Sequence, residues 1–284
     1  MPNFPIVDSH LHLWDPEFIR YPWLEGNTLL NRPYLLDDYT RDCEQTTVEA
    51  MVFVQCEAEF SAFAAETSWA DQQAVRDSRI KGIVAWAPLE KGRAVETDLT
   101  TLMRHDLLRG IRRIIQFEED IGFCLRANFI EGVQTLATFG LSFDICVDYR
   151  QMPSILTFVE HVPDTTLILD HIGKPAIRDS AMEPWATYIR ALAEFPNVVC
   201  KISGVANEAK ANWSVSDLRP YIDVALSAFG FNKVMYGGDW PVALQAITLP
   251  KWVATLDDIL KGVNELDCRK FWRDNAVRIY RLGI

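Results

Sequence analysis

A pair of histidines near the start of the chain offers the clearest chemistry in the sequence. His10 and His12 belong to the run Asp8-Ser9-His10-Leu11-His12, at the end of an apolar stretch. Alternation along a strand places both imidazoles on one face. Imidazoles at this spacing suit a metal ion, and they suit equally two neutral donors aimed at one oxygen atom. For His-x-His taken alone, satisfaction by backbone groups at a strand end is a serious alternative.

Other polar residues stand near the ends of later apolar runs. His171 ends a run that continues into a polar loop, and Arg112 lies within another run. Asp239 directly follows Gly237 and Gly238. We expect the two glycines to let the backbone turn sharply and present Asp239. Because a Gly-Gly-Asp turn is common on its own, Asp239 becomes a candidate general base only together with the histidine pair.

Short apolar strands alternating with longer amphipathic stretches must position these residues. The predicted strands cover residues 6–10, 50–55, 80–86, 110–115, 142–147, 166–171, 198–202 and 233–236, and the predicted helices cover residues 36–46, 62–78, 94–105, 128–139, 152–161, 184–195, 218–229 and 250–261. Nearly all the strands are continuously apolar, which is typical of parallel strands covered on both faces. The pattern predicts a parallel α/β architecture.

Such strands could form an open doubly wound sheet or a closed barrel. Both folds gather functional groups at the C-terminal ends of the strands. In a closed ring the last strand pairs with the first, so that His10, His12 and Asp239 converge. The sequence has no G-x-G-x-x-G after the first strand and no G-x-x-x-x-G-K-[ST], so a nucleotide-binding open sheet loses its usual support. We predict a (β/α)8 TIM barrel in which residues 1–284 form a single domain.

The charge balance indicates a small-molecule protein. The 284 residues include 28 Lys and Arg against 39 Asp and Glu, a net charge of −11 that disfavours binding to nucleic acid or anionic membrane. We find neither a secretory signal nor an apolar run of the ~18 residues that a membrane span needs. We therefore expect a cytoplasmic protein whose six cysteines are reduced, buried thiols. The oligomeric state is left open, a homo-oligomer included.

Several motifs resemble the amidohydrolase superfamily, and within it the sugar-lactonase branch that includes L-fuconolactonase and L-rhamnonolactonase. The motifs run along nearly the whole chain and comprise Asp8-Ser9-His10-Leu11-His12-Leu13-Trp14, Gly110-Ile111-Arg112-Arg113, Leu169-Asp170-His171-Ile172-Gly173-Lys174-Pro175, Cys200-Lys201-Ile202-Ser203-Gly204 and Tyr236-Gly237-Gly238-Asp239-Trp240-Pro241. The resemblance implies a (β/α)8 barrel that hydrolyses a lactone ring.

Carried over residue by residue, the resemblance implies active-site histidines at His10, His12 and His171, a water-activating aspartate at Asp239 and a substrate-contacting arginine at Arg112. With an ordinary pKa of about 3.9, the aspartate would be ionised at neutral pH and accept the proton of the attacking water. The histidines and the arginine would donate hydrogen bonds to the carbonyl oxygen, each worth roughly 3 to 4 kcal/mol of the barrier. We therefore expect that no metal or other cofactor is required.

A zinc enzyme on the same fold is the nearest alternative. His10, His12, His171 and Asp239 could hold one Zn²⁺ with an open position for water, in a mononuclear hydrolase or decarboxylase. A two-metal site is not expected, because the other two histidines fall near the C-terminal ends of predicted helices. A non-catalytic sugar-acid binding protein that retains the pocket is a further alternative.

The candidate substrate contacts are aromatic and amide side chains near the strand ends. The long connection 13–33 contains Trp14 and Trp23, whose faces suit the apolar side of a sugar-derived ring, although each could equally pack on the barrel top. Trp86 and Gln55 end predicted strands, and we expect Gln55 to bind a hydroxyl group. The expected partner is a small sugar lactone. Its identity, its ring size and the acid that protonates the leaving group are left open.

Charged residues inside the predicted strands need partners. We expect Asp144 to pair with Arg112 of the neighbouring strand. For Lys201 we expect structural pairing rather than catalysis. Arg113 alternates with Arg112 and should form a salt bridge in the helix layer, whereas Glu57 is expected to be solvated.

Overall fold

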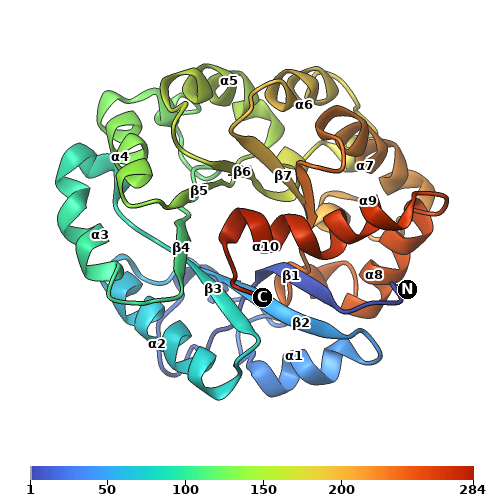
Figure 1. Cartoon of the computed structure of the whole chain (residues 1–284), viewed down its shortest axis with the longest axis horizontal. Helices are drawn as coiled ribbons and strands as arrows, with labels where there is room; N and C mark the ends of the chain where they lie inside the picture. The colour runs from blue at the N-terminus through green and yellow to red at the C-terminus, as the bar shows by residue number, and fades with distance from the viewer. Residues whose placement is uncertain (1) are drawn as a thin grey trace.

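The strands follow one another in chain order around a ring (Figure 1). The structure is a computed structural model that describes residues 2–284. Its eight parallel strands are β1 (Ile6–Leu11), β2 (Val48–Val54), β3 (Ile80–Ala85), β4 (Leu108–Ile111), β5 (Ser142–Ile145), β6 (Leu167–Leu169), β7 (Val198–Ile202) and β8 (Val234–Tyr236). Nearly every strand residue is buried, in agreement with the continuously apolar patterns of the sequence.

The ring closes where β8 continues into the loop that follows it. Leu11 forms a parallel bridge with Trp240. The His12 amide donates to the Trp240 carbonyl at 2.8 Å, and the Asp239 amide donates to the His10 carbonyl at 2.8 Å. The predicted (β/α)8 barrel is confirmed, and backbone groups of the candidate site residues make the closing hydrogen bonds.

Helices surround the barrel, one after each strand (Figure 1). They are α1 (Leu36–Cys43), α2 (Phe63–Arg76), α3 (Glu96–Leu102), α4 (Ala127–Thr138), α5 (Met152–His161), α6 (Trp185–Ala193), α7 (Val215–Phe229) and α8 (Leu249–Ile259). Each overlaps a predicted helix. α7 begins before the predicted residue 218, because Ser214 and Asp217 form a capping box there. Among residues 2–284, no helix is long and apolar enough to cross a bilayer.

The C-terminal segment forms elements that the sequence did not predict. These are α9 (Glu265–Arg269), a π-helical turn (Lys270–Asp274) and α10 (Asn275–Tyr280). Figure 1 shows α10 lying across the ring of strands. Its side chains and Leu282 join inward-facing strand residues in one apolar cluster: Val7, Ala50, Val52, Val54, Val84, Ile168, Val199, Met235, Ala276, Ile279, Tyr280 and Leu282. The segment thus seals the N-terminal end of the barrel.

The cysteines are free thiols, as expected. Five are buried, and Cys268 is half-buried. Cys56 and Cys146 lie against the cavity at the other end of the barrel.

Candidate active site

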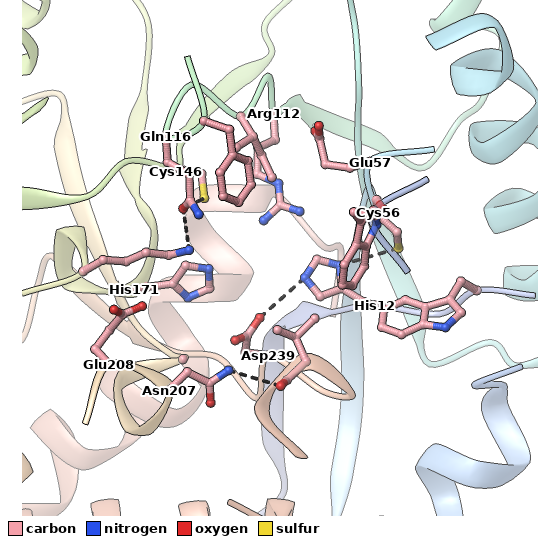
Figure 2. A pocket seen from close by; sticks show the side chains of 17 residues that line it. His12, Cys56, Glu57, Arg112, Gln116, Cys146, His171, Asn207, Glu208 and Asp239 are labelled. Atoms are coloured by element: carbon pink, nitrogen blue, oxygen red, sulfur yellow. Dashed lines mark hydrogen bonds and ion pairs between the residues drawn. The ribbon is translucent and has the colours of Figure 1, made fainter. Parts of the chain in front are cut away.

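A cavity of about 220 Å³ lies at the C-terminal ends of the strands (Figure 2). Its lining comes chiefly from the loops that follow the strands, which is where the functional sites of such barrels are built. His12, Arg112, His171 and Asp239 all line it. His10 is fully buried next to them, with its ring 4.9 Å from that of His12.

Three imidazoles converge on one carboxylate. Asp239 Oδ1 lies 3.5 Å from His12 Nε2 and 3.7 Å from His10 Nε2. The His171 ring lies 4.7 Å from the His10 ring, and its Nδ1 is 2.9 Å from Ser203 Oγ. Residues from the two ends of the chain therefore meet in one pocket, as the closed barrel predicted.

A buried aspartate connects the first strand to the loop after the last. Asp8 Oδ1 accepts hydrogen bonds from the amides of His10 at 3.0 Å and Gly238 at 2.8 Å. A Cβ atom at Gly238 would lie only 2.4 Å from Asp8 Oδ2. Neither Gly237 nor Gly238 has a positive φ, whereas Asp239 itself has a φ of 54°. The expected glycine turn is therefore wrong: glycine makes room for Asp8, and Asp239 adopts the left-handed conformation.

Left-handed backbone is concentrated at the cavity. Among the lining residues, φ is 55° at Glu57, 54° at His171, 45° at Lys174 and 54° at Asp239. Ile172, a β-branched residue next to His171, has a φ of 50°. Each such residue costs on the order of 1 to 3 kcal/mol and persists only where the surrounding packing holds it. The packing of the barrel thus holds these residues in a strained backbone conformation that directs their side chains into the cavity.

The hydrogen bonding of His12 decides what its ring can do. Its Nδ1 lies 2.7 Å from the Val54 carbonyl oxygen, which can only accept, so Nδ1 carries the proton. Burial lowers the pKa of His12, which favours the neutral ring. Nε2 then has a lone pair that faces the Asp239 carboxylate, another acceptor. A neutral His12 with its proton on Nδ1 has none on Nε2, so the predicted donation by His12 to a substrate carbonyl would need the protonated ring.

The carboxylate and the imidazoles are held in different charge states. Burial by itself would raise the pKa of Asp239, but the surrounding histidines His171, His12 and His10 hold it well below its ordinary range. Burial lowers the pKa of His171 to about 4, against a smaller opposing effect of Asp239. At neutral pH the site therefore presents an ionised carboxylate among neutral rings.

Arg112 brings a permanent positive charge to the cavity. Its Nη2 donates to the Gln55 carbonyl at 2.5 Å. Its Nη1 lies 3.1 Å from His10 Nε2 and 3.4 Å from Asp170 Oδ2. Because a guanidinium does not lose its proton in proteins, Arg112 is a donor whatever the tautomers of the histidines.

A layer of buried charges lies beneath the cavity, inside the barrel. Lys201 Nζ is 2.5 Å from Asp144 Oδ2, 3.2 Å from Asp170 Oδ1 and 3.2 Å from His10 Nδ1. The Tyr280 hydroxyl of α10 donates to Asp144 Oδ2 at 2.7 Å. The side chains of Lys201, Asp144 and Asp170 are fully buried. One chain of contacts therefore connects the sealed end of the barrel to His10.

The observed ion pairs correct one predicted pair and confirm two other predictions. The partner of Asp144 is Lys201 and not Arg112, because the guanidinium donates to the Gln55 carbonyl and contacts Asp170 instead. Structural pairing of Lys201 is confirmed. Arg113 forms the expected salt bridge, with Glu118 at 2.5 Å.

Comparison with known proteins identifies the family. The sequence model of the protein family described as Amidohydrolase matches residues 7–282. The chain belongs to the amidohydrolase family. The resemblance seen in the sequence is therefore confirmed at the level of the family.

Relatives align with this amidohydrolase over nearly its full length. The L-fucono-1,5-lactonase of Burkholderia multivorans is 32% identical over 289 residues, which cover 97% of this chain and 96% of the relative. The L-rhamnono-gamma-lactonase of Scheffersomyces stipitis is 24% identical over 340 residues, which cover 99% of this chain and 100% of the relative. A solved amidohydrolase of B. multivorans with bound zinc has a TM-score of 0.88 at 31% identity, covering 98% of this chain and 99% of that chain.

The predicted substrate contacts of the amidohydrolase divide into two groups. Trp14 and Trp23 line the cavity and stack edge-to-face at 5.4 Å. Gln55 and Trp86 are not among the lining residues. The Gln55 side chain is buried and donates to Glu57 at 2.8 Å, while Trp86 packs against the aromatic rings of α2 and the turn before it. The structure therefore gives these two side chains other partners.

Several lining residues were missed or undervalued. Gln116, Lys174, Asn207 and Glu208 all line the cavity, and Lys174 Nζ donates to Gln116 Oε1 at 2.5 Å. Glu57, expected to be solvated, lines it as well. All of them lie in loops that follow predicted strands. The expectation that functional residues stand at the C-terminal strand ends, which located His171 and Asp239, should therefore have included the first residues of each following loop.

The residues of the site fit a metal ion. His10, His12 and Asp239 offer ligand atoms that all lie within 4.8 Å of one another, and His10, Asp170 and His171 form a second such group. Imidazole nitrogen and carboxylate oxygen are donors that Zn²⁺ accepts. His12 Nε2 and Asp239 Oδ1 face each other as two acceptors 3.5 Å apart. A cation, a proton or a water molecule shared between them would satisfy both lone pairs.

Proposed function

We propose that this amidohydrolase hydrolyses a sugar-derived aldonolactone to the open-chain sugar acid. The observation that carries the proposal is the ionised Asp239 carboxylate, placed in a cavity beside Arg112 and His171. The full-length likeness to enzymes named L-fucono-1,5-lactonase and L-rhamnono-gamma-lactonase supports the substrate class.

Hydrolysis needs an activated water and a partner for the developing oxyanion. Asp239 accepts a proton from the water, and its low pKa keeps it ionised for that task. Arg112 donates to the carbonyl oxygen, a contribution of about 3 to 4 kcal/mol by comparison with other oxyanion donors. His171 can add a second donor, since its Nδ1 is 2.9 Å from a serine hydroxyl that can take either hydrogen-bonding role.

The shape of the cavity suits one small, hydroxyl-bearing ring. Its volume of about 220 Å³ is below the roughly 300 to 1,000 Å³ of sites for larger ligands. Trp23, which packs edge-to-face on the buried Trp14, offers an aromatic face to the apolar side of the ring. Gln116 and Asn207 offer hydrogen-bonding groups to hydroxyls.

A pH-indicator screen of aldonolactones tests the proposal, because each ring opened releases a proton. We expect turnover of at least one five- or six-membered aldonolactone and its loss in Asp239→Asn. Binding of lactones without turnover, or turnover that survives this substitution, would contradict the proposal.

A zinc-dependent version of the reaction is the second candidate, favoured by the facing acceptors of His12 and Asp239. These two residues and His10 would hold the ion, which supplies Lewis-acid polarisation of a bound oxygen. Metal content and activity should be measured before and after chelation. Activity that falls on chelation and returns with Zn²⁺ supports this version, whereas metal-free protein with full activity excludes it.

A further inference from the structure

A second carboxyl group in the cavity has no role in water activation. Glu208 ends the 3₁₀ turn Val205–Glu208 after β7 and lines the same cavity as Asp239 and His171. We propose that Glu208 is the general acid that protonates the ring oxygen of the lactone as it leaves. This inference rests on the proposed function.

The turn that carries Glu208 is built against the reacting groups. A Cβ atom at Gly204, the residue before the turn, would lie 2.7 Å from both Asp239 Oδ2 and His171 Nδ1. Asn207 Nδ2 donates to the Val242 carbonyl at 3.1 Å, which fastens the turn to the loop after β8. Figure 2 shows Glu208 and His12 on opposite sides of Asp239. Glu208 therefore borders the cavity on the side of Asp239 away from His12.

The Glu208 carboxyl group is available for this task. No group within residues 2–284 donates a hydrogen bond to it or forms an ion pair with it. Lys174, a cation of the same cavity lining, donates instead to Gln116. Glu57, the other glutamate of the lining, already accepts a hydrogen bond from Gln55 at 2.8 Å.

The surroundings of Glu208 favour its protonated form. Glu208 faces Lys174, Asp239, Arg178 and Asp148. Burial raises its pKa above the ordinary value, and the attraction of Lys174 only partly opposes this. A raised pKa keeps a carboxyl group protonated up to a higher pH, which suits a general acid.

The proton balance closes with these two residues. The water oxygen bonds to the carbonyl carbon, Asp239 takes one water proton, and the carbonyl π electrons move to the carbonyl oxygen. When C=O re-forms, the bond from the carbonyl carbon to the ring oxygen breaks. The ring oxygen keeps that electron pair and takes the proton of Glu208. Solvent carries the proton from Asp239 back to Glu208, and the product acid ionises.

The experiment compares two leaving groups in Glu208→Gln. An aldonolactone that the wild type opens releases an alkoxide, which needs a proton, whereas dihydrocoumarin releases a stabilised phenolate, which does not. We expect kcat to fall by about 10²-fold or more on the aldonolactone and by no more than about 3-fold on dihydrocoumarin. A loss of equal size on both substrates, or a rise in KM with kcat kept, would overturn the proposal.

A pH profile gives a readout that does not depend on the phenolic substrate. On the aldonolactone, kcat of the wild type should fall on the alkaline side as Glu208 loses its proton, and Glu208→Gln should lack this fall. An alkaline limb unchanged in the variant would contradict the assignment.

Glu57→Gln is the matched control, since it removes the other glutamate charge of the cavity. We expect it to change kcat by the same factor on both substrates. A wild type that opens no aldonolactone in the screen refutes the proposed function itself. A wild type that opens one while Glu208→Gln stays fully active refutes only the role of Glu208.

Discussion

The two ends of the barrel are built from the same eight strands in opposite ways. At the N-terminal end, inward side chains such as Val52 and Met235 pack with Ile279 of α10 in an apolar cluster. At the C-terminal end, the inward side chains are imidazoles, carboxylates and a guanidinium, and positive φ values recur in the lining. Burial of apolar surface stabilises one end, and the other end is strained and polar.

A layer of charges separates the two ends. Lys201 lies between Asp144 and Asp170, and Tyr280 joins it from below. A buried ion pair is weak as a source of stability, but removal of one partner leaves an uncompensated charge. The residues that stabilise the fold and those that perform the chemistry are therefore separated along the barrel axis. Four substitutions can test that separation.

Asp239→Asn should have the largest effect, confined to the mouth. Loss of the general base should lower kcat/KM by about 10² to 10⁴-fold on the aldonolactone. The urea midpoint should fall as well, because the amide keeps the shape of the side chain but loses the charge that its surroundings stabilise. Steady-state assays and urea unfolding measure the two quantities, and a large loss of stability with activity kept would reverse the assignment of this end.

Lys201→Met should affect both ends. It leaves Asp144 and Asp170 buried without their ammonium partner, which should lower the free energy of unfolding by about 3 to 5 kcal/mol. Activity should also fall, since Lys201 Nζ contacts His10 Nδ1. Urea denaturation at neutral pH measures the first effect. A loss below about 1 kcal/mol would mean that the layer is not held by its charges.

Ile279→Ala should affect only the sealed end. Truncation of this buried side chain should cost about 2 to 5 kcal/mol of unfolding free energy and leave kcat/KM unchanged. The half-buried Val277 of the same helix provides a matched control, and Val277→Ala should cost less. If activity falls in proportion to stability, the two ends are not independent.

Tyr280→Phe should have the smallest effect on stability of the four substitutions. Tyr280 lies at the boundary between the sealed end and the charged layer. It removes the hydroxyl that donates to Asp144, while Lys201 still pairs with that carboxylate. We expect a loss of about 1 kcal/mol in unfolding free energy. Equilibrium denaturation of this variant and of Lys201→Met under the same conditions compares their free energies of unfolding. A loss as large as that of Lys201→Met would place Tyr280 inside the charged layer.

Local sequence patterns predicted the fold and the centre of the site well. The apolar strands and the His-x-His pair led to the barrel and to the meeting of His10, His12 and Asp239. The C-terminal seal was missed because its helices are short and carry no long apolar pattern. The partner of Asp144 was wrong because a long side chain can leave its neighbour and contact other groups instead.

The sequence by itself determined which polar residues stand at the strand ends, because strand alternation and the position of each strand end are local properties. Only the tertiary structure decided which atoms face one another. The Val54 carbonyl sets the tautomer of His12, Asp8 requires the glycine at 238, and no hydrogen-bond donor among residues 2–284 reaches Glu208. These outcomes depend on contacts between distant segments and on how far each side chain extends inside a closed barrel.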